Sequence, residues 1–467
     1  MPPLTSHPSL RAALAGVDLA GRQLLAADAA VSFSDVAAGW SLALDRHALA
    51  GSSVAIVTSE QLAAALALLD LDGVARRMVV VPADLRPEHL ASIVADAEID
   101  TIVTDRDPAS FADLKVARIV PCGLPAAAPG IAHDAPRSTE WVLLTSGTTG
   151  VPKMVVHSLS ALVAAIGAAP PASKSIVWAT FYDIRRYGGL QIFLRAVMGA
   201  RSLVLSKADE PVADHLARLA ACGVTHISGT PSHWRRALMC ASAGAIAPDY
   251  VRLSGEVADQ AILNALRAAY PAARIGHAYA STEAGVGFAV DDGLEGFPAS
   301  LLDATRSDFA MKVDEGTLRV RSSGAASRYL GRAAEPLSDA DGYIDTGDMV
   351  ELRQGRFFFV GRRGGIINVG GLKVHPEEVE AVINRHRGVL MSLVKARRSP
   401  IIGAIVVADV VLDEETSAHT NAEGQLLKDA IIRFCRSTLP QHKVPAAVRF
   451  VPALAMTTAG KLQRDHA

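Results

Sequence analysis

Hydrophobic and polar residues between positions 53 and 105 follow two alternating patterns. The segments SVAIVTS (53–59), RMVVVPA (77–83) and IDTIVTD (99–105) are short apolar runs typical of buried strands. Between them, LAAALALLD (62–70) and PEHLASIVADAE (87–98) have the length and composition of helices. Strands that alternate with helices in this way predict a parallel sheet covered by helices.

A second series of the same kind lies between positions 175 and 230. It contains the apolar runs SIVWATF (175–181), SLVLS (202–206) and THISGT (225–230), with helices predicted over 190–198 and 216–221. Two α/β layers therefore occupy most of the first 290 residues.

The pattern changes beyond about residue 318. Short strands separated by glycines, such as TLRVRSS, DGYIDTG and GRFFFVG, predict a small β-rich subdomain. From residue 361 a compact α+β segment begins, and PEEVEAVINRH (376–386) predicts a helix with proline in its first turn. The predicted fold is α/β: a large multi-layer N-terminal domain, with two sheet layers and a β-rich subdomain, followed by a small α+β C-terminal domain.

Composition narrows the classes of function. A chain of 467 residues is too long for one compact core and points to two or more domains. With 50% hydrophobic residues, 20% charged residues and a net charge of -2, it lacks the basic excess of a nucleic-acid binder, so we expect no nucleic-acid partner. The most apolar stretch, LAAALALL (62–69), is too short to cross a bilayer, so we expect no membrane association.

The cysteines point to a compartment. Cys122, Cys222, Cys240 and Cys435 lie far apart and form no C-x-x-C pair, which indicates neither a disulfide framework nor a zinc site. No signal-peptide pattern is found at the N-terminus. We therefore predict a cytoplasmic protein.

The segment LLTSGTTGVPK (143–153) carries the first candidate chemistry. A predicted strand runs into a glycine-rich turn whose backbone N–H groups and hydroxyls can surround an anion, with phosphate the obvious guest. The donors are Thr145, Ser146, Thr148 and Thr149, with Gly147 and Gly150 allowing close approach and Lys153 adding a positive charge. The alternative for so short a match alone is an ordinary polar loop.

The order of residues in this loop excludes one familiar nucleotide site. Lys153 follows Pro152 and precedes Met154, so the GK[ST] sequence of a Walker A motif is missing. Kinase and motor functions that depend on that motif lose their main support.

Four further segments follow the loop in a fixed order: HAYASTEAG (277–285), YIDTGD (343–348), GRRGGIINVGG (361–371) and TTAGKLQR (457–464). With the loop, they resemble the adenylate-forming superfamily, which includes acyl- and aryl-CoA ligases, adenylation domains of peptide synthetases and firefly luciferase. The resemblance covers roughly residues 141–464. It implies an enzyme that uses ATP and Mg²⁺ to activate a carboxylic acid, releases pyrophosphate, and then passes the acyl group from AMP to the thiol of coenzyme A.

The resemblance also assigns roles to individual residues. It places residues 145–153, including the candidate catalytic residues Thr145 and Lys153, on the ATP phosphates, and Ser254, Gly255 and Glu256 beside adenine. Tyr279 corresponds to the aromatic that stacks on adenine, with Ala280 and Ser281 following it. Thr282 and Glu283 correspond to the pair that contacts phosphate and magnesium, whose preferred ligands are hard oxygens. Asp348 and Arg362 match the residues at the ribose, and Lys461 matches the lysine that bridges the acid carboxylate and the α-phosphate.

The implied acid pocket mixes aromatic and small residues, which suits a compact, partly apolar acid of the aryl or short branched type. Its predicted residues are Tyr182, Arg185, Tyr187, Gly189, Thr230, His233, Gly285 and Gly287. We expect His233 to be structural or pocket-lining, since the substrate carboxylate is already ionised and needs no base. Arg185 or Arg186 stands near the place of a family histidine, and either contacts an extra group on the acid or pairs with Asp183 as scaffolding, the option we favour.

The resemblance further implies a moving domain. It divides the chain into an N-terminal domain (1–361), a hinge (362–365) and a mobile C-terminal domain (366–467), which rotates after adenylation to bring Gly370 and Gly371 to a thiol channel. The hinge departs from the family pattern because Gly365 stands where an aspartate, glutamate or lysine is usual, and its neighbour Gly364 is a second glycine.

Two other functions remain open from the sequence. A stand-alone adenylation enzyme that loads a separate carrier protein would share all of these motifs. A non-catalytic nucleotide-binding protein is discouraged because Lys461, Glu283 and Asp348 are all present.

Overall fold

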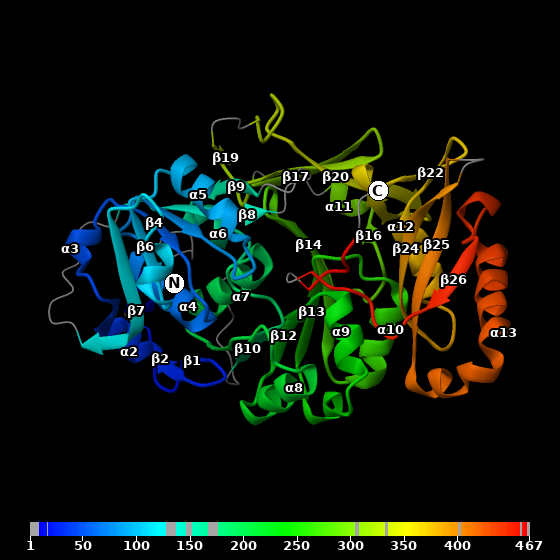
Figure 1. The fold of residues 1–467 in the computed structure, drawn as a ribbon, viewed down its shortest axis with the longest axis horizontal. Coiled ribbons are helices and arrows are strands. Elements are labelled where there is room, and N and C mark those ends of the chain that lie inside the picture. The colour runs from blue at the N-terminus through cyan, green and yellow to red at the C-terminus, as the bar shows by residue number, and fades with distance from the viewer. Residues whose placement is uncertain are drawn as a thin grey trace.

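The computed structural model describes residues 9–15, 17–127, 137–145, 152–166, 176–303, 308–331, 335–399, 403–457 and 460–464. Figure 1 shows two sheet-and-helix units side by side, a β-rich unit above them and a C-terminal unit at the other end of the molecule. The described helices include none with the length and apolar character needed to span a bilayer.

The first predicted α/β layer is an eight-stranded sheet. Its strands, in spatial order, are β19 (Arg328–Leu330), β9 (Lys153–His157), β8 (Glu140–Thr145), β5 (Arg77–Val80), β4 (Ser53–Ile56), β6 (Thr101–Thr104), β7 (Arg118–Ala127) and β3 (Gly39–Leu42). Strands β4, β5 and β6 are parallel and buried along their whole length, as their continuous apolar runs predict. The helices α4 (Gln61–Leu71) and α5 (Pro87–Asp96) occupy the predicted positions.

The second layer is another eight-stranded sheet. In spatial order it contains β15 (Gly285–Val290), β14 (Arg274–Ser281), β13 (Tyr250–Ser254), β12 (His226–Gly229), β10 (Val177–Thr180), β11 (Ser202–Val204), β1 (Gln23–Leu25) and β2 (Ala30–Ser32). One face packs on α8 (Val212–Ala221), α9 (Pro231–Leu238) and α10 (Gln260–Ala269). The long helix α7 (Tyr187–Met198) shares a buried apolar cluster with α4 of the first layer, and so joins the two layers.

Short elements complete the N-terminal part. They are α1 (Leu10–Leu14), α2 (Phe33–Ala38), α3 (Arg46–Leu49), α6 (Leu159–Val163), α11 (Ser300–Asp303) and the 3₁₀ turns Pro108–Phe111 and Ala241–Ala245. The predicted β-rich subdomain is a five-stranded sheet of β16 (Phe297–Pro298), β21 (Arg356–Arg362), β20 (Ile344–Arg353), β18 (Thr317–Ser322) and β17 (Phe309–Asp314). Its strands enclose an apolar core of their own.

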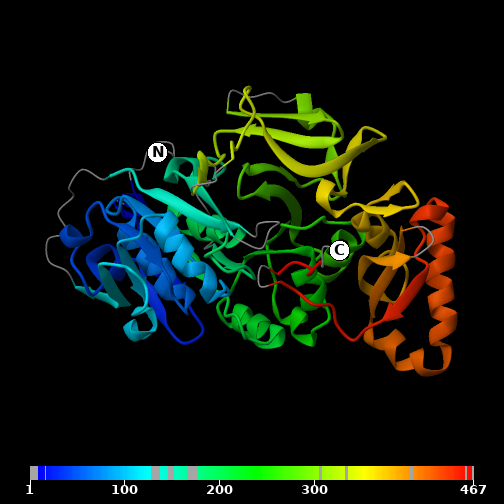
Figure 2. The same cartoon turned by 45° about the horizontal axis from the view of Figure 1, so that its top comes forward.

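The C-terminal unit has the predicted α+β character. It contains the hairpin β22 (Ile367–Val369) and β23 (Leu372–Val374), α12 (Pro376–Ile383), a sheet of β24 (Val389–Ser399), β25 (Gly403–Leu412) and β26 (Ala447–Phe450), the helix α13 (Glu414–Thr438) and the 3₁₀ turns Arg363–Gly365 and Gln441–Lys443. A separate apolar cluster holds it together. After β26 the chain runs back toward the second sheet, which Figure 2 shows as the red segment entering the green unit.

Candidate active site

The returning tail is attached to the N-terminal part by two long-range hydrogen bonds. The Thr230 hydroxyl donates to the Gly460 carbonyl over 2.6 Å, and the Leu462 N–H donates to Glu256 Oε1 over 2.8 Å. The second oxygen of Glu256 accepts the Ser232 N–H, at 3.0 Å, in the first turn of α9. Glu256 therefore ties the tail to the loop that leads into α9.

This attachment brings Lys461 to the segment predicted to lie beside adenine. A Cβ atom on Gly255 would lie 3.3 Å from Cε and 3.9 Å from Nζ of Lys461, and Gly255 has a φ of +86° that favours glycine. Lys461 retains solvent-accessible surface. Even so, burial among its neighbours, with the charge of Arg362, lowers its pKa, while Glu256 and Asp348 oppose that change. The structure thus brings Lys461 close to four residues predicted from distant segments: Gly255, Glu256, Asp348 and Arg362.

Tyr279, Asp348 and Arg362 also meet. The Tyr279 hydroxyl donates to Asp348 Oδ2 over 2.7 Å, and Arg362 Nε donates to Oδ1 over 2.9 Å. The Tyr279 ring lies nearly parallel to the rings of Phe288 and Phe359. Burial and the negative charge of Asp348 raise the pKa of Tyr279 well above its usual value, so the phenol stays neutral. An ionised carboxylate has further lone pairs, so Asp348 can accept additional hydrogen bonds at this place.

The predicted phosphate loop is described only at its two ends. Thr145 and Lys153 pair across β8 and β9, whereas Ser146, Gly147, Thr148, Thr149 and Gly150 lie outside the described residues. Lys153 Nζ lies 5.1 Å from the centroid of the Tyr329 ring, and the Tyr329 hydroxyl lies 3.5 Å from Glu283 Oε1. Tyr329 therefore connects two predicted catalytic residues, although its own sequence context carried no signal of a site.

Glu283 fits the predicted magnesium. Its carboxylate contacts only one described side-chain donor, at a long distance, and so retains acceptor capacity. No group of three or more metal-binding side chains occurs within the described part of the chain. A single carboxylate is nevertheless suited to Mg²⁺, which commonly takes its other ligands from water and substrate phosphates.

The predicted acid pocket contains a well-defined aromatic wall. The Tyr182 hydroxyl donates to the Ser254 carbonyl over 2.7 Å and lies 3.0 Å from the Ser254 hydroxyl. Its ring meets His233 edge-on, at 5.7 Å between centroids. Tyr187 is buried on the first turn of α7. Ser254, which Tyr182 contacts, immediately precedes Gly255, so this wall lies next to the position of Lys461.

His233 is held by local structure. It forms a capping box with Thr230 at the start of α9, with backbone and side-chain bonds in both directions. Burial lowers its pKa to about 3, so the ring is neutral at physiological pH. This arrangement agrees with a structural, pocket-lining residue rather than a proton acceptor.

Arg185 does not line the pocket, contrary to its place among the predicted pocket residues. The residue is 2% exposed, and its guanidinium donates to both carboxylate oxygens of Asp183 and to the carbonyls of Thr58 and Ser59. Such a saturated, buried group has no capacity for a substrate. The contacts of Arg185 are those of a scaffolding residue, the alternative favoured from the sequence. Arg186 pairs with a different carboxylate, that of Asp84.

At two of the predicted pocket glycines, another backbone segment packs too closely for a Cβ atom. A Cβ atom on Gly189 would lie 2.2 Å from the Asp183 carbonyl oxygen, and one on Gly285 would lie 2.3 Å from that of Gly324. A Cβ atom on Gly287 would instead lie 3.0 Å from the Tyr279 ring. The first two glycines therefore allow close approach of backbone segments. Gly287 lies beside Tyr279, and Gly285 pairs in register with Ser281, so both border predicted nucleotide residues.

The predicted hinge and thiol-channel glycines lie away from these contacts. Gly364 and Gly365 form a short 3₁₀ turn, with open space where their Cβ atoms would be. Gly370 and Gly371 form the turn of the β22–β23 hairpin, where the Gly371 N–H donates to the Asn368 side chain over 2.8 Å. Their assignment to a thiol channel stays a prediction.

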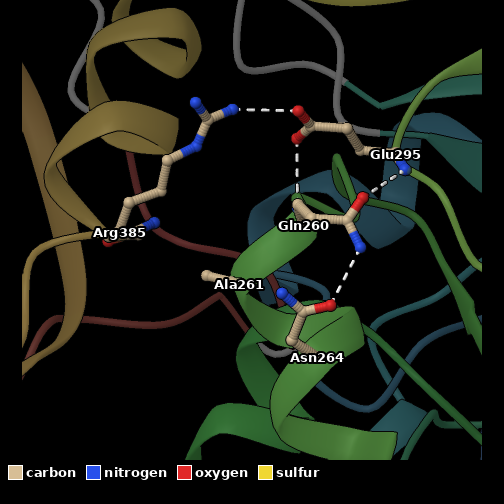
Figure 3. Close-up of a pocket in the computed structure, with 6 residues that line it drawn as sticks. Gln260, Ala261, Asn264, Glu295 and Arg385 are labelled. Carbon is tan, nitrogen blue, oxygen red and sulfur yellow. Dashed lines mark hydrogen bonds and ion pairs between the residues drawn. The ribbon is translucent and has the colours of Figure 1, made fainter. Parts of the chain in front are cut away.

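A set of polar contacts, called the polar seam below, joins the C-terminal unit to α10 and the residues around it. Figure 3 shows Arg385 directed at Glu295, with 2.9 Å between the charged atoms, while Glu295 also accepts the Gln260 N–H. These residues border a shallow hollow of about 480 Å³. Nearby, Arg235 reaches both Asp259 and the Leu390 carbonyl. No sequence motif indicated this seam, because it depends on how two units dock.

With the site assembled, the class of protein can be stated. Residues 41–330 match the family of AMP-binding enzymes, and residues 378–461 match the AMP-binding enzyme C-terminal domain. The chain belongs to the AMP-binding enzyme family, and the resemblance inferred from its motifs is confirmed.

One of the similar proteins matches most of its length, and another matches a shorter part. A 2-succinylbenzoate–CoA ligase of Listeria monocytogenes serotype 4b (strain F2365) is 27% identical over 391 residues, covering 80% of this chain and 77% of that protein. A human mitochondrial acyl-coenzyme A synthetase is 34% identical, but only over 27% of this chain and 21% of its own length.

Solved structures support the fold. An anthranilate CoA ligase in complex with anthranoyl-AMP superposes with a TM-score of 0.78 at 18% identity, covering 97% of this chain and 95% of that one. An amide bond synthetase from Marinactinospora thermotolerans superposes with a TM-score of 0.77 at 19% identity, covering 98% of each chain. At this level of identity the likeness establishes the shared α/β architecture, which confirms the predicted fold class.

Proposed function

We propose that this enzyme activates a carboxylic acid with ATP and transfers the resulting acyl group to the thiol of coenzyme A. The observation that carries the proposal is the position of Lys461. This lysine comes from the tail of the C-terminal unit and lies at Gly255, where its charge interacts with Asp348 and Glu256. An ammonium group in that place stabilises negative charge that develops between a carboxylate and the α-phosphate.

The chemistry has two half-reactions. The acid carboxylate attacks the α-phosphorus of ATP, the bond from that phosphorus to the bridging oxygen breaks, and pyrophosphate leaves. A thiolate then attacks the carbonyl carbon of the mixed anhydride, and AMP leaves with the electron pair of the broken C–O bond. In the first half, Lys461 lies at the reacting groups, while Thr145 and Lys153 flank the loop assigned to the phosphates.

The other residues bind and orient the substrates. Tyr279, Asp348 and Arg362 form the nucleoside end of the site, and Tyr182 with Ser254 forms the wall beside the acid. Glu283 would hold Mg²⁺, which supplies positive charge to the phosphates when bound. The names of the relatives support coenzyme A as the acceptor and an aryl acid as the substrate. The four cysteines are free thiols, which fits the predicted cytoplasm.

Pyrophosphate exchange tests the first half of the proposal. The purified protein would be assayed with ATP, Mg²⁺ and a panel of acids that includes 2-succinylbenzoate and anthranilate, and then with coenzyme A and mass detection of the thioester. We expect exchange and a thioester for at least one acid. Exchange without a coenzyme A thioester would favour a carrier-protein acceptor, and the lack of exchange with every acid would contradict the proposal.

Replacing Asp348 with asparagine tests the nucleoside end. The change keeps the shape of the side chain but removes the negative charge shared by Tyr279 and Arg362, so we expect the KM for ATP to rise about tenfold, the loss of one charge-assisted hydrogen bond. Asp345→Asn is a matched control on the same strand, where Asp345 pairs with Arg363. An unchanged KM in Asp348→Asn, in a protein of normal thermal stability, would remove Asp348 from the ribose site.

A further inference from the structure

The face of the second sheet that turns toward α7 has a polar lining. Val251 and Leu253 of β13 belong to the apolar cluster under α8, α9 and α10. Since side chains alternate along a strand, Arg252 and Ser254 point to the opposite face, toward α7. On the neighbouring strand β12, Ser228 pairs in register with Arg252 and lies on the same face.

This face continues the predicted acid site into the protein. Ser254 contacts the Tyr182 hydroxyl and immediately precedes Gly255, beside which Lys461 lies. Arg252 is two residues earlier on the same strand, and two residues of extended chain span about 7 Å. Arg252 therefore lies about 7 Å deeper than the place where the acid carboxylate meets Lys461.

Two arginines on this face have no counter-ion among the residues that the structure describes. Neither Arg252 nor Arg195 makes a side-chain hydrogen bond or ion pair with any described residue, whereas Arg218 and Arg235, comparably enclosed, each pair with a carboxylate. Arg195 projects from α7 over the Trp178 ring, at 6.0 Å from its centroid. Burial and the charge of Arg252 lower the pKa of Arg195 to about 10. Two like charges thus face each other in a partly buried place.

The carboxylate of Asp291 lies against Gly276, where a Cβ atom would be 1.9 Å from Asp291 Oδ1, and Gly276 pairs in register with Arg252. Asp291 and Arg252, both described in the structure, form no ion pair with each other. Asp291 therefore does not neutralise the arginine directly.

Two buried polar atoms nearby also have no partner. Ser228 Oγ and Gln191 Oε1 make no hydrogen bond within the described structure, although the two residues are only 1% and 6% exposed. Gln191 lies one helical turn from both Tyr187 and Arg195 on the same side of α7. An unsatisfied buried polar group costs about 1–3 kcal/mol, so several together indicate a place built for a polar ligand.

We propose that the acid activated by this enzyme carries a second anionic group, which Arg252 binds, with Arg195, Ser228 and Gln191 around it. The inference rests on the proposed function and specifies its substrate class: a diacid whose two carboxylates are about 5–8 Å apart, as the strand spacing requires. The planar guanidinium of Arg252 can bind a carboxylate through two parallel hydrogen bonds. A monoacid has no second carboxylate to place there.

Matched acid pairs test the inference. We would compare hexanedioate with hexanoate, and benzene-1,3-dicarboxylate with benzoate, as kcat/KM in pyrophosphate exchange. We expect at least a tenfold preference for the diacid in one pair, and at least a tenfold fall in that preference in Arg252→Gln, since a charge-assisted bond is lost. Arg76→Gln, which alters an exposed arginine before β5 of the other sheet, is the matched control and should keep the preference.

Calorimetric titration of the same acids, in the presence of a non-hydrolysable ATP analogue, separates the two proposals. Tighter binding of a diacid than of its monoacid, weakened in Arg252→Gln, supports the inference even if no acid in the panel exchanges pyrophosphate, a result that would count only against the proposed function. Exchange or binding that favours the monoacids, a preference unchanged by Arg252→Gln, or no binding of either diacid would overturn the inference.

Discussion

Lys461→Ala is expected to slow acyl-adenylate formation by about 10²- to 10³-fold, the usual effect of removing one group that stabilises transition-state charge. The reason is the position of Lys461, whose Nζ would lie 3.9 Å from a Cβ atom on Gly255. The second half-reaction, started from synthetic acyl-adenylate and coenzyme A, should fall much less, because its charge develops on the acyl carbonyl oxygen rather than around the α-phosphorus. Single-turnover measurement of each half gives the comparison.

Lys428→Ala, on α13 of the same C-terminal unit, is the control. Equal rates of adenylation in Lys461→Ala and the wild type would refute the assignment. The pH dependence gives a second check: because burial lowers the pKa of Lys461, its charge is lost at a lower pH than for an ordinary lysine. Adenylation should therefore decline, as pH rises, before the usual lysine pKa of about 10.4 is reached.

Gly460→Ala is expected to reduce adenylation by about tenfold or more without touching any charged group. Gly460 has a φ of +69°, and a Cβ atom there would lie 1.7 Å from the His233 ring, so the tail could not keep its bond to Thr230. The residue next to it is Lys461, which would be displaced from Gly255. A 1 Å misplacement of a reacting group can cost about 10²-fold in rate, so the effect should appear in kcat for adenylation.

Gly223→Ala separates the clash from backbone strain. Gly223 has a similar φ of +63°, but a Cβ atom there meets nothing within 4 Å, and the residue lies in the turn after α8. We expect Gly223→Ala to lower the thermal stability slightly and to leave the rate of adenylation unchanged. If Gly460→Ala adenylated at the wild-type rate, the docked tail would not be the arrangement that performs the first half-reaction.

Much of the architecture follows from local patterns. The strand and helix alternation over 53–105 and 175–230 predicts both large sheets, because buried parallel strands need continuous apolar runs and the helices between them need an apolar stripe. The helix predicted over 216–221 is longer in the structure, as α8 begins at Val212, since Pro211 at its N-cap restricts the chain before it. The segment DGYIDTG, predicted to contain a short strand, instead leads into the ten-residue strand β20.

The site was predictable only where motifs carry it. Lys461, Asp348, Arg362 and Tyr279 were all predicted from short segments, and the structure places them near one another. Arg185 was assigned wrongly to the pocket because its partners, Asp183, Thr58 and Ser59, are decided by the packing of α7 against the first sheet. Tyr329 and Arg252 lie outside every motif. The face of the sheet toward which each side chain points is known only once the strand register is known.

The amino-acid sequence by itself determined the order of strands and helices, the two large sheets and the family of AMP-binding enzymes, since periodicity and short motifs act over a few residues. Only the tertiary structure decided which groups share one site. Leu462 bonds to Glu256 across 206 positions of chain, and Arg252 meets α7 rather than the apolar cluster on the other face. Such contacts depend on how layers and units dock, and docking is set by the shape and packing of whole faces rather than by any short stretch of chain.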